Sequence, residues 1–72
     1  MTEAKEVEVQ PHQQRVVEEK TELDSRLEKL KAFIETEKFQ SLSFDERWDL
    51  RAQRAVMSEY SDILRRRIAA WG

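Results

Sequence analysis

Cysteine is absent from this sequence, and glycine and proline occur once each in 72 residues. Without cysteine there is no disulfide framework and no thiol chemistry, so we expect an intracellular protein. One glycine and one proline leave no glycine-rich phosphate loop and too few turn residues for a β-protein. A single histidine cannot form a zinc cluster with other histidines or cysteines, and we predict no metal and no cofactor.

Long apolar runs are also missing. No stretch approaches the ~20 residues of a membrane span, so we expect no membrane insertion. Charged residues make up 39% of the chain, yet the net charge is only −2. This balance argues against general nucleic-acid binding, which usually requires a basic surplus. With 72 residues the chain is at most one domain, near the lower size limit for a stable core.

Two seams of mostly apolar residues with helical spacing dominate the rest of the sequence. Their members are spaced alternately four and three apart, which is the 3.5-residue repeat of helices that pack along their length. The first seam comprises Val16, Lys20, Leu23, Leu27, Leu30 and Ile34, and the second comprises Leu50, Gln53, Met57, Tyr60, Leu64, Arg67 and Trp71. The two seams predict an all-α fold with two packed helices.

The predicted helices span about residues 12–37 and 44–70, with a break at 38–43. Ser43 and Glu46 fit the capping box S-x-x-E, in which each side chain binds a backbone N–H at the helix start. So short a connection makes the two helices antiparallel, which gives an αα-hairpin.

The beginning of the chain lacks this periodicity. Residues 1–11 are polar and end in Pro11, which disfavours helix immediately before it. We therefore predict a flexible N-terminal arm over 1–11, followed by the hairpin over 12–72.

A lone hairpin is too thin to bury all of its apolar residues. Two helices cannot cover both the seams and the large side chains beside them. The side chains expected to stay exposed in one chain are Phe33, Phe39, Phe44, Trp48, Val56, Ile63 and Ile68. We therefore predict a homo-oligomeric helical bundle with these residues at subunit contacts. A marginal monomer with an exposed apolar flank is the alternative.

The sequence contains no recognisable catalytic arrangement. His12 has no cysteine or serine close to it, and carboxylate pairs such as Glu18 and Glu19 fall on solvated helix faces. A carboxyl catalyst needs a pocket that raises its pKa, and a hairpin of this size has no internal pocket. We predict that the protein is not an enzyme.

Polar residues interrupt both seams. Lys20 has an inward position and is either a register-specifying residue or a phosphate contact in a cleft between subunits. Its pairing with Asp24, four residues further on, is expected on the exposed side of the helix. Gln53 and Arg67 are either interhelical hydrogen-bonding partners or ligand-binding residues.

Cationic and aromatic residues gather where the helix ends meet. Antiparallel packing brings the start of the first helix beside the end of the second. The residues brought near one another there are His12, Arg15, Arg65, Arg66, Arg67 and Trp71. Arginine forks suit phosphate and a flat ring suits a base, so this set, with Lys20, is typical of a nucleotide site. The alternative is a set of solvated charges that complement the helix dipoles.

The residues in both halves resemble a group of small phage and prophage proteins. The resemblance covers about residues 12–70. It rests on the run His12-Gln13-Gln14-Arg15-Val16-Val17-Glu18-Glu19-Lys20, on Leu23, Leu27, Leu30 and Phe33-Ile34, and on Gln53, Met57, Tyr60, Ile63-Leu64 and Arg67-Ile68. These proteins are in turn similar to the helical-hairpin sponges that phages use against nucleotide-signalling immunity, the anti-CBASS and Thoeris anti-defence proteins.

The resemblance implies a small, oligomeric, non-catalytic protein in the cytoplasm of an infected bacterial host. It would sequester a cyclic di- or trinucleotide or a cyclic ADP-ribose-type messenger between subunits and so inhibit antiviral signalling. From the residues themselves we hypothesise that Arg15, Lys20 and the Arg65–Arg67 run hold the phosphates of this messenger, and that His12 or Trp71 stacks on its base. One alternative is a helical interaction module that docks on a host protein and blocks it. Another is a nucleic-acid-associated phage regulator, which the near-neutral charge disfavours.

Overall fold

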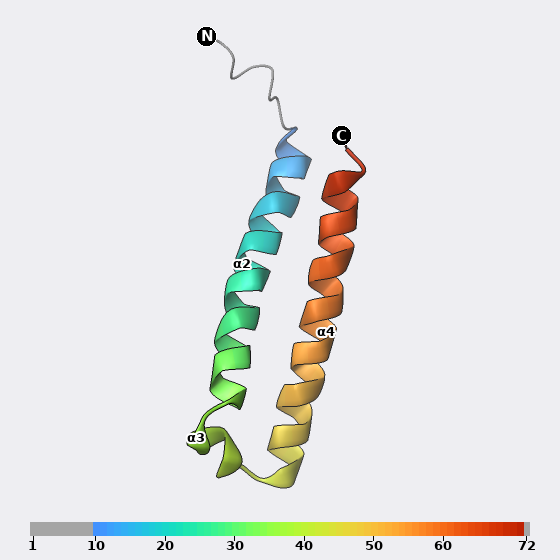
Figure 1. The fold of residues 1–72 in the computed structure, drawn as a ribbon. Coiled ribbons are helices and arrows are strands. Elements are labelled where there is room, and N and C mark those ends of the chain that lie inside the picture. The colour runs from blue at the N-terminus through green and yellow to red at the C-terminus, as the bar shows by residue number, and fades with distance from the viewer. Residues whose placement is uncertain (1–9, 72) are drawn as a thin grey trace.

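The computed structural model describes residues 10–71, and within them it forms an antiparallel helical hairpin (Figure 1). Helix α2 spans Pro11–Ile34, α3 spans Glu37–Gln40 and α4 spans Phe44–Ala69. The long helices α2 and α4 lie side by side, and the short α3 forms the turn between them. The predicted all-α two-helix hairpin is confirmed. The flexible arm was predicted over residues 1–11, of which 1–9 lie outside the described residues.

The first long helix ends at Ile34, three residues earlier than predicted, because Thr36 starts a new helix. The backbone of Thr36 is extended, with φ −97° and ψ 162°. Its hydroxyl donates to the Phe33 carbonyl (2.6 Å) and accepts from the Phe39 N–H (3.2 Å). A threonine that caps the following turn in this way draws the chain out of the preceding helix. The break predicted over 38–43 therefore contains most of α3.

Helix α3 buries Phe39 completely, at 0% exposure. The Phe39 ring meets the Phe33 ring edge to face, with centroids 6.0 Å apart and an interplanar angle of 89°. The guanidinium carbon of Arg51 lies 5.2 Å from the centre of the Phe39 ring on the α4 side. The expectation that Phe39 would be exposed in a single chain is wrong, because α3 folds the ring under the end of the hairpin.

Helix α4 begins with the capping box predicted from the sequence. The Ser43 hydroxyl accepts from the Glu46 N–H (3.2 Å), and the Glu46 carboxylate accepts from the Ser43 N–H (3.4 Å). Asp45 and Glu46 in the first turn also complement the helix dipole.

Substituting Ser43 with alanine is expected to lower the free energy of unfolding by about 1 kcal/mol, because one N-terminal N–H loses its acceptor. Urea unfolding followed by circular dichroism measures the change. Ser25→Ala, at an exposed position within α2, is the matched control and should cost nothing. Equal stability of Ser43→Ala and the wild type would contradict a contribution from this cap.

The buried residues lie between the helices and under α3. They are Val16, Leu27, Ile34, Phe39 and Leu64. The chain measures 54 × 21 × 15 Å along its principal axes, so it is two helices wide and has little interior. Leu64, at 0% exposure, is the residue of α4 that the hairpin encloses most fully.

The second seam is only partly as predicted. Leu50 and Met57 are half-buried and Leu64 is buried, but the alternate positions are not inward. Gln53, Tyr60, Arg67 and Trp71 are all exposed. Ser61 and Ile68, each one residue further along the chain than Tyr60 and Arg67, are half-buried instead. The inward assignment of Gln53, Tyr60, Arg67 and Trp71 is therefore wrong.

Helix α4 presents apolar side chains away from α2 as well as toward it. Large apolar residues that remain exposed are Phe44, Trp48, Val56, Tyr60, Ile63 and Trp71. Phe44 and Trp48 stack on each other, with ring centroids 6.4 Å apart, although they are 67% and 63% exposed. By contrast, the outward positions of α2, such as Glu18, Ser25 and Lys29, are polar. The exposure predicted for Phe44, Trp48, Val56 and Ile63 is confirmed, and the homo-oligomeric bundle stays a prediction.

Within residues 10–71, no helix is both long enough and apolar enough to cross a bilayer.

Candidate functional site

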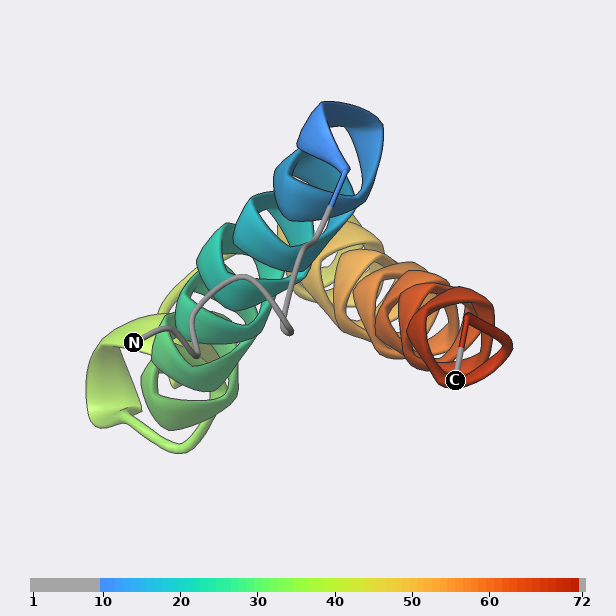
Figure 2. The same ribbon diagram turned by 90° about the horizontal axis from the view of Figure 1, so that it is seen from above.

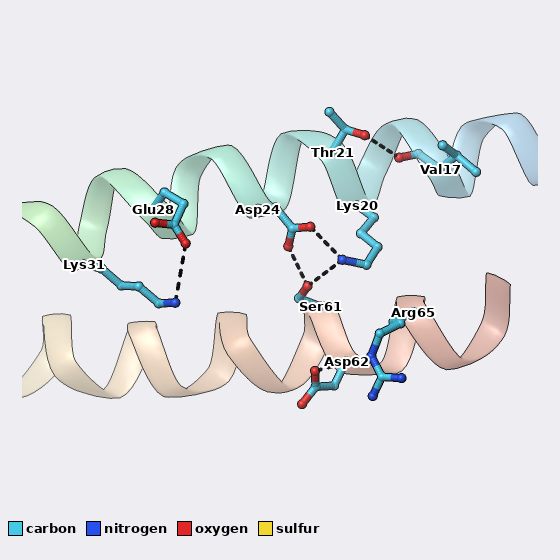
Figure 3. Close-up of polar contacts among 9 residues, drawn as sticks. All are labelled: Val17, Lys20, Thr21, Asp24, Glu28, Lys31, Ser61, Asp62 and Arg65. Atoms are coloured by element: carbon cyan, nitrogen blue, oxygen red, sulfur yellow. Dashed lines mark hydrogen bonds and ion pairs between the residues drawn. The ribbon is translucent and has the colours of Figure 1, made fainter. Parts of the chain in front are cut away.

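Lys20, Asp24 and Ser61 form a polar cluster between the two long helices (Figure 3). The Lys20 ammonium donates to Asp24 Oδ2 (2.6 Å) and to Ser61 Oγ (3.2 Å). Ser61 in turn donates to Asp24 Oδ1 (2.5 Å), which joins α2 to α4. Because the cluster lies between the helices, the expectation that Lys20 and Asp24 pair on the exposed side of the helix is wrong.

This cluster satisfies Lys20 within its own hairpin. The Lys20 side chain is 24% exposed, and its charge is balanced by Asp24. An anionic ligand at Lys20 would have to compete with that carboxylate. The geometry therefore supports the role of Lys20 in setting the register of the two helices, since Ser61 can complete the cluster in one register.

Substituting Asp24 with asparagine is expected to remove a pH-dependent part of the stability. Hydrogen bonds from Lys20 and then from Ser61 lower the pKa of Asp24 below its ordinary value of 3.8. A carboxyl group with a depressed folded-state pKa stabilises the fold above its unfolded pKa, and that stability is lost as the pH falls through the folded-state pKa. Because 43% of the Asp24 side chain is exposed, solvent screening keeps the effect small.

Urea unfolding of wild type and Asp24→Asn across pH 2 to 7 tests this dependence. The wild type should be the more stable at pH 7, and the difference should shrink below about pH 4. A difference that does not change over this range would contradict the assignment.

A second contact between the helices lies beside this cluster. The Tyr60 hydroxyl donates to the Glu19 carboxylate on α2. Tyr60 is 38% exposed, so its ring lies at the edge of the helix pair rather than in the seam. This contact fixes one edge of the hairpin and leaves the outer side of α4 open.

Apart from Lys20, the predicted site residues belong to the open end of the hairpin, where α2 begins and α4 ends (Figure 1). The view from above shows that the two helices are inclined to each other, so these ends diverge (Figure 2). The side chains of His12 and Arg15 on α2, and of Trp71 just after α4, are exposed. Among residues 10–71 no hydrogen bond or ion pair joins His12 or Arg15 to the end of α4.

The three consecutive arginines do not form one cluster. Successive residues on an α-helix point about 100° apart, so Arg65, Arg66 and Arg67 leave α4 in three directions. All three are exposed. Arg65 has a partner in its own turn, with its Nε 3.9 Å from Asp62 Oδ1. A single hairpin therefore does not bring the predicted set onto one ligand.

Several open hollows lie along the surface of α4, between Trp48 and Ile63. One is lined by Arg51, Arg54, Ala55, Ser58 and Glu59. Its neighbour is apolar and is lined by Ala55, Val56, Glu59, Tyr60 and Ile63. Another, toward the loop, is lined by Trp48, Arg51 and Ala52. These hollows lie on the surface of one helix, and none is an enclosed cavity.

Arg51 and Arg54 are not among the predicted site residues. The sequence carries a signal for them, since Arg47, Arg51 and Arg54 are spaced four and three apart and must share one side of α4. That side lies next to the seam rather than in it. Among residues 10–71 no group of three or more histidine, cysteine or carboxylate side chains is placed to hold a metal ion.

The match to a family model covers all three helices of the hairpin. The model described as Sequestin matches residues 10–70, and α2, α3 and α4 all lie within that range. This agrees with the resemblance of the sequence to small sponge-like phage proteins. Comparison with curated proteins gave no match, and comparison with solved structures gave none either. The chain belongs to the Sequestin family.

Proposed function

We propose that this protein is a phage-encoded, non-catalytic sponge that sequesters a cyclic nucleotide immune messenger at interfaces between its own copies. By lowering the free messenger concentration in the cytoplasm of an infected bacterial host, it would inhibit antiviral signalling. The match of residues 10–70 to the Sequestin family carries the proposal, since the family name indicates sequestration and a binding role. The messenger would be a cyclic di- or trinucleotide or a cyclic ADP-ribose-type molecule.

The shape of one chain explains why the proposal requires several copies. A particle of 54 × 21 × 15 Å is too thin to enclose a nucleotide. Tight capture of an anion depends on charge-assisted hydrogen bonds in a cleft from which water is excluded. Packing α4 against another copy would cover the exposed side chains of Val56 and Ile63 and would close the neighbouring hollows.

Assembly would also resolve the scatter of the arginines at the open end. Arg65, Arg66 and Arg67 point in different directions on one helix, but arginines from neighbouring copies can meet in one cleft. His12 and Trp71 would then provide ring faces for a base. Lys20 is the weakest member of the predicted set, because Asp24 already occupies its ammonium group.

Isothermal titration calorimetry with a panel of cyclic di- and trinucleotides and cyclic ADP-ribose isomers tests the proposal. We expect binding of at least one member, with the nucleotide recovered unchanged by chromatography. The folded state and the mass of the assembly are confirmed in the same sample by circular dichroism and light scattering. The absence of heat with every member, for a folded assembly, would contradict the function. A chemically altered nucleotide would contradict the non-catalytic role.

A second candidate function is a helical interaction module that docks on a host protein. The stacked and largely exposed rings of Phe44 and Trp48 near the loop favour it, because exposed aromatic pairs are common at protein interfaces. This candidate predicts that the two rings stay accessible after self-association. Recovery of one stoichiometric host protein by the wild type, lost in Trp48→Ala, together with no binding in the nucleotide panel, would favour the docking module.

A further inference from the structure

One side of α4 carries a row of hydrogen-bond donors that the predicted site does not include. Its members are Arg47, Arg51, Arg54 and Ser58, spaced four, three and four residues apart. Residues with this spacing share one side of a helix. The row lies between the side of α4 that faces α2 and the outer apolar side, which carries Trp48 and Ala55.

The arginines of this row differ in how many hydrogen-bond partners they already have within the chain. Arg47 is held by the loop, since its Nη1 donates to the carbonyls of Gln40 (2.8 Å) and Leu42 (3.2 Å). Within the part of the chain that the structure describes, Arg51 and Arg54 have no carboxylate oxygen within 4.0 Å. Their guanidinium groups therefore keep their N–H donors for a ligand.

The guanidinium group of Arg51 is nevertheless held in place by an aromatic ring. Its guanidinium carbon lies 5.2 Å from the centre of the Phe39 ring, and that ring is completely buried and held by Phe33. A cation–π contact attracts the charge to the ring face without requiring a hydrogen-bond donor. The arginine is thereby ordered before a ligand arrives, which reduces the entropy lost on binding.

Arg51, Arg54 and Ser58 line one open hollow, together with Ala55 and Glu59. Residues three apart on a helix have Cβ atoms about 5–6 Å from each other. Two arginines carried on neighbouring positions of this kind can each direct one guanidinium fork to one of two adjacent phosphate groups. The Ser58 hydroxyl can donate to the second phosphate. The small Ala55 side chain lets a ligand approach the helix.

The surroundings of this hollow suit the rest of a nucleotide. Trp48, which is 63% exposed, lines the adjoining hollow with Arg51 and Ala52 and offers a ring face for a base. The Glu59 carboxylate at the other edge would repel a phosphate, but it can accept hydrogen bonds from sugar hydroxyls. An aromatic ring, paired arginines and an acceptor therefore line two adjoining hollows on a single helix.

We propose that Arg51, Arg54 and Ser58 form the binding site for the two adjacent phosphates of a cyclic ADP-ribose-type nucleotide, with Trp48 beside the base. The inference rests on the proposed sequestering function and locates its phosphate site on the side of α4, rather than at the open end of the hairpin. The hollow is open in one chain, so a second copy packed on the adjoining apolar side would close it over the ligand.

Nuclear magnetic resonance with inorganic pyrophosphate as the probe tests the site directly. We expect the Nε–Hε signals of Arg51 and Arg54 and the amide signal of Ser58 to shift on titration. Inorganic orthophosphate should bind more weakly, because it can engage only one fork. Arg54→Ala should weaken pyrophosphate binding about tenfold through the loss of one charge-assisted bidentate contact.

Two further variants sharpen the test. Arg54→Lys keeps the charge without the fork and should not restore the affinity. Arg26→Ala on α2 is the matched control, since it removes an equally charged side chain that is 73% exposed, and its affinity should equal that of the wild type. Circular dichroism confirms the fold of each variant. Shifts confined to Arg65–Arg67, shifts spread evenly over all arginines, or no shifts at millimolar pyrophosphate would overturn the site.

The same variants separate this inference from the proposed function. If Arg54→Ala binds the nucleotide recognised by the wild type with unchanged affinity, the function stands and the location is wrong. If pyrophosphate binds at Arg51 and Arg54 but no nucleotide of the panel binds, the phosphate site stands and the sponge function is wrong.

Discussion

Replacing Phe39 with alanine is expected to lower the free energy of unfolding by about 3–5 kcal/mol, the usual cost of removing a buried phenylalanine. A domain of this size has about that much stability in total, so most of the variant should be unfolded in water. The ring is completely buried, meets Phe33 edge to face and lies under Arg51. Its loss would leave a cavity where α2, α3 and α4 meet.

Phe44→Ala is the matched control, since it removes the same side chain at a position that is 67% exposed. Its effect on a single chain should be below about 1 kcal/mol. Urea unfolding monitored by circular dichroism compares the stability of Phe39→Ala and Phe44→Ala. The protein concentration is chosen so that both variants have the same association state. Equal loss of stability in both variants would show that α3 does not anchor the hairpin through Phe39.

Substituting Val56 with glutamate is expected to weaken self-association by about 100-fold or more, because a buried unpaired carboxylate costs several kcal/mol at an interface. Val56 is 66% exposed in one chain and lies beside Ile63 on the outer side of α4. The hairpin itself should stay folded, because the Val56 side chain does not belong to the hydrophobic core.

Light scattering coupled to size-exclusion chromatography measures the result. The wild type should have a mass of several chains, and Val56→Glu should approach the 8.6 kDa of one chain. Thr21→Glu, at an exposed position on the outer side of α2, is the control and should leave the mass unchanged. A wild type that is a single chain, or a Val56→Glu variant with the wild-type mass, would contradict association through α4.

The hairpin could be predicted from the sequence because two strong signals agree. The seam of α2 gave Val16, Leu27 and Ile34, all of which are buried. The capping box at Ser43 gave the start of α4. Both signals are local, since helical periodicity and N-cap chemistry depend on neighbouring residues only.

The residues of α4 that face α2 are predicted less accurately, and the reason is geometric. From an inward residue, the position three further on lies about 60° to one side and the position four further on about 40° to the other. The alternation favoured Tyr60 and Arg67, whereas the structure turns Ser61 and Ile68 toward α2. A polar serine carries no sequence signal for an inward position. Its hydrogen-bonding partners Lys20 and Asp24 on the other helix account for it.

The burial of Phe39 could not be predicted because it depends on a four-residue helix. So short a helix has no periodicity, and its one local signal is the cap at Thr36. The ring is buried by α2 and α4 together, which is a tertiary effect. The same limit applies to the candidate site, because the contact between Arg51 and Phe39 exists only once α3 has folded.

Mass spectrometry under non-denaturing conditions, on protein purified from bacteria that produce a cyclic nucleotide messenger, tests the central claim most directly. We expect an assembly of several 8.6 kDa chains that carries bound nucleotide and releases it intact on denaturation. A single chain, or an assembly without nucleotide from cells that contain the messenger, would contradict the account.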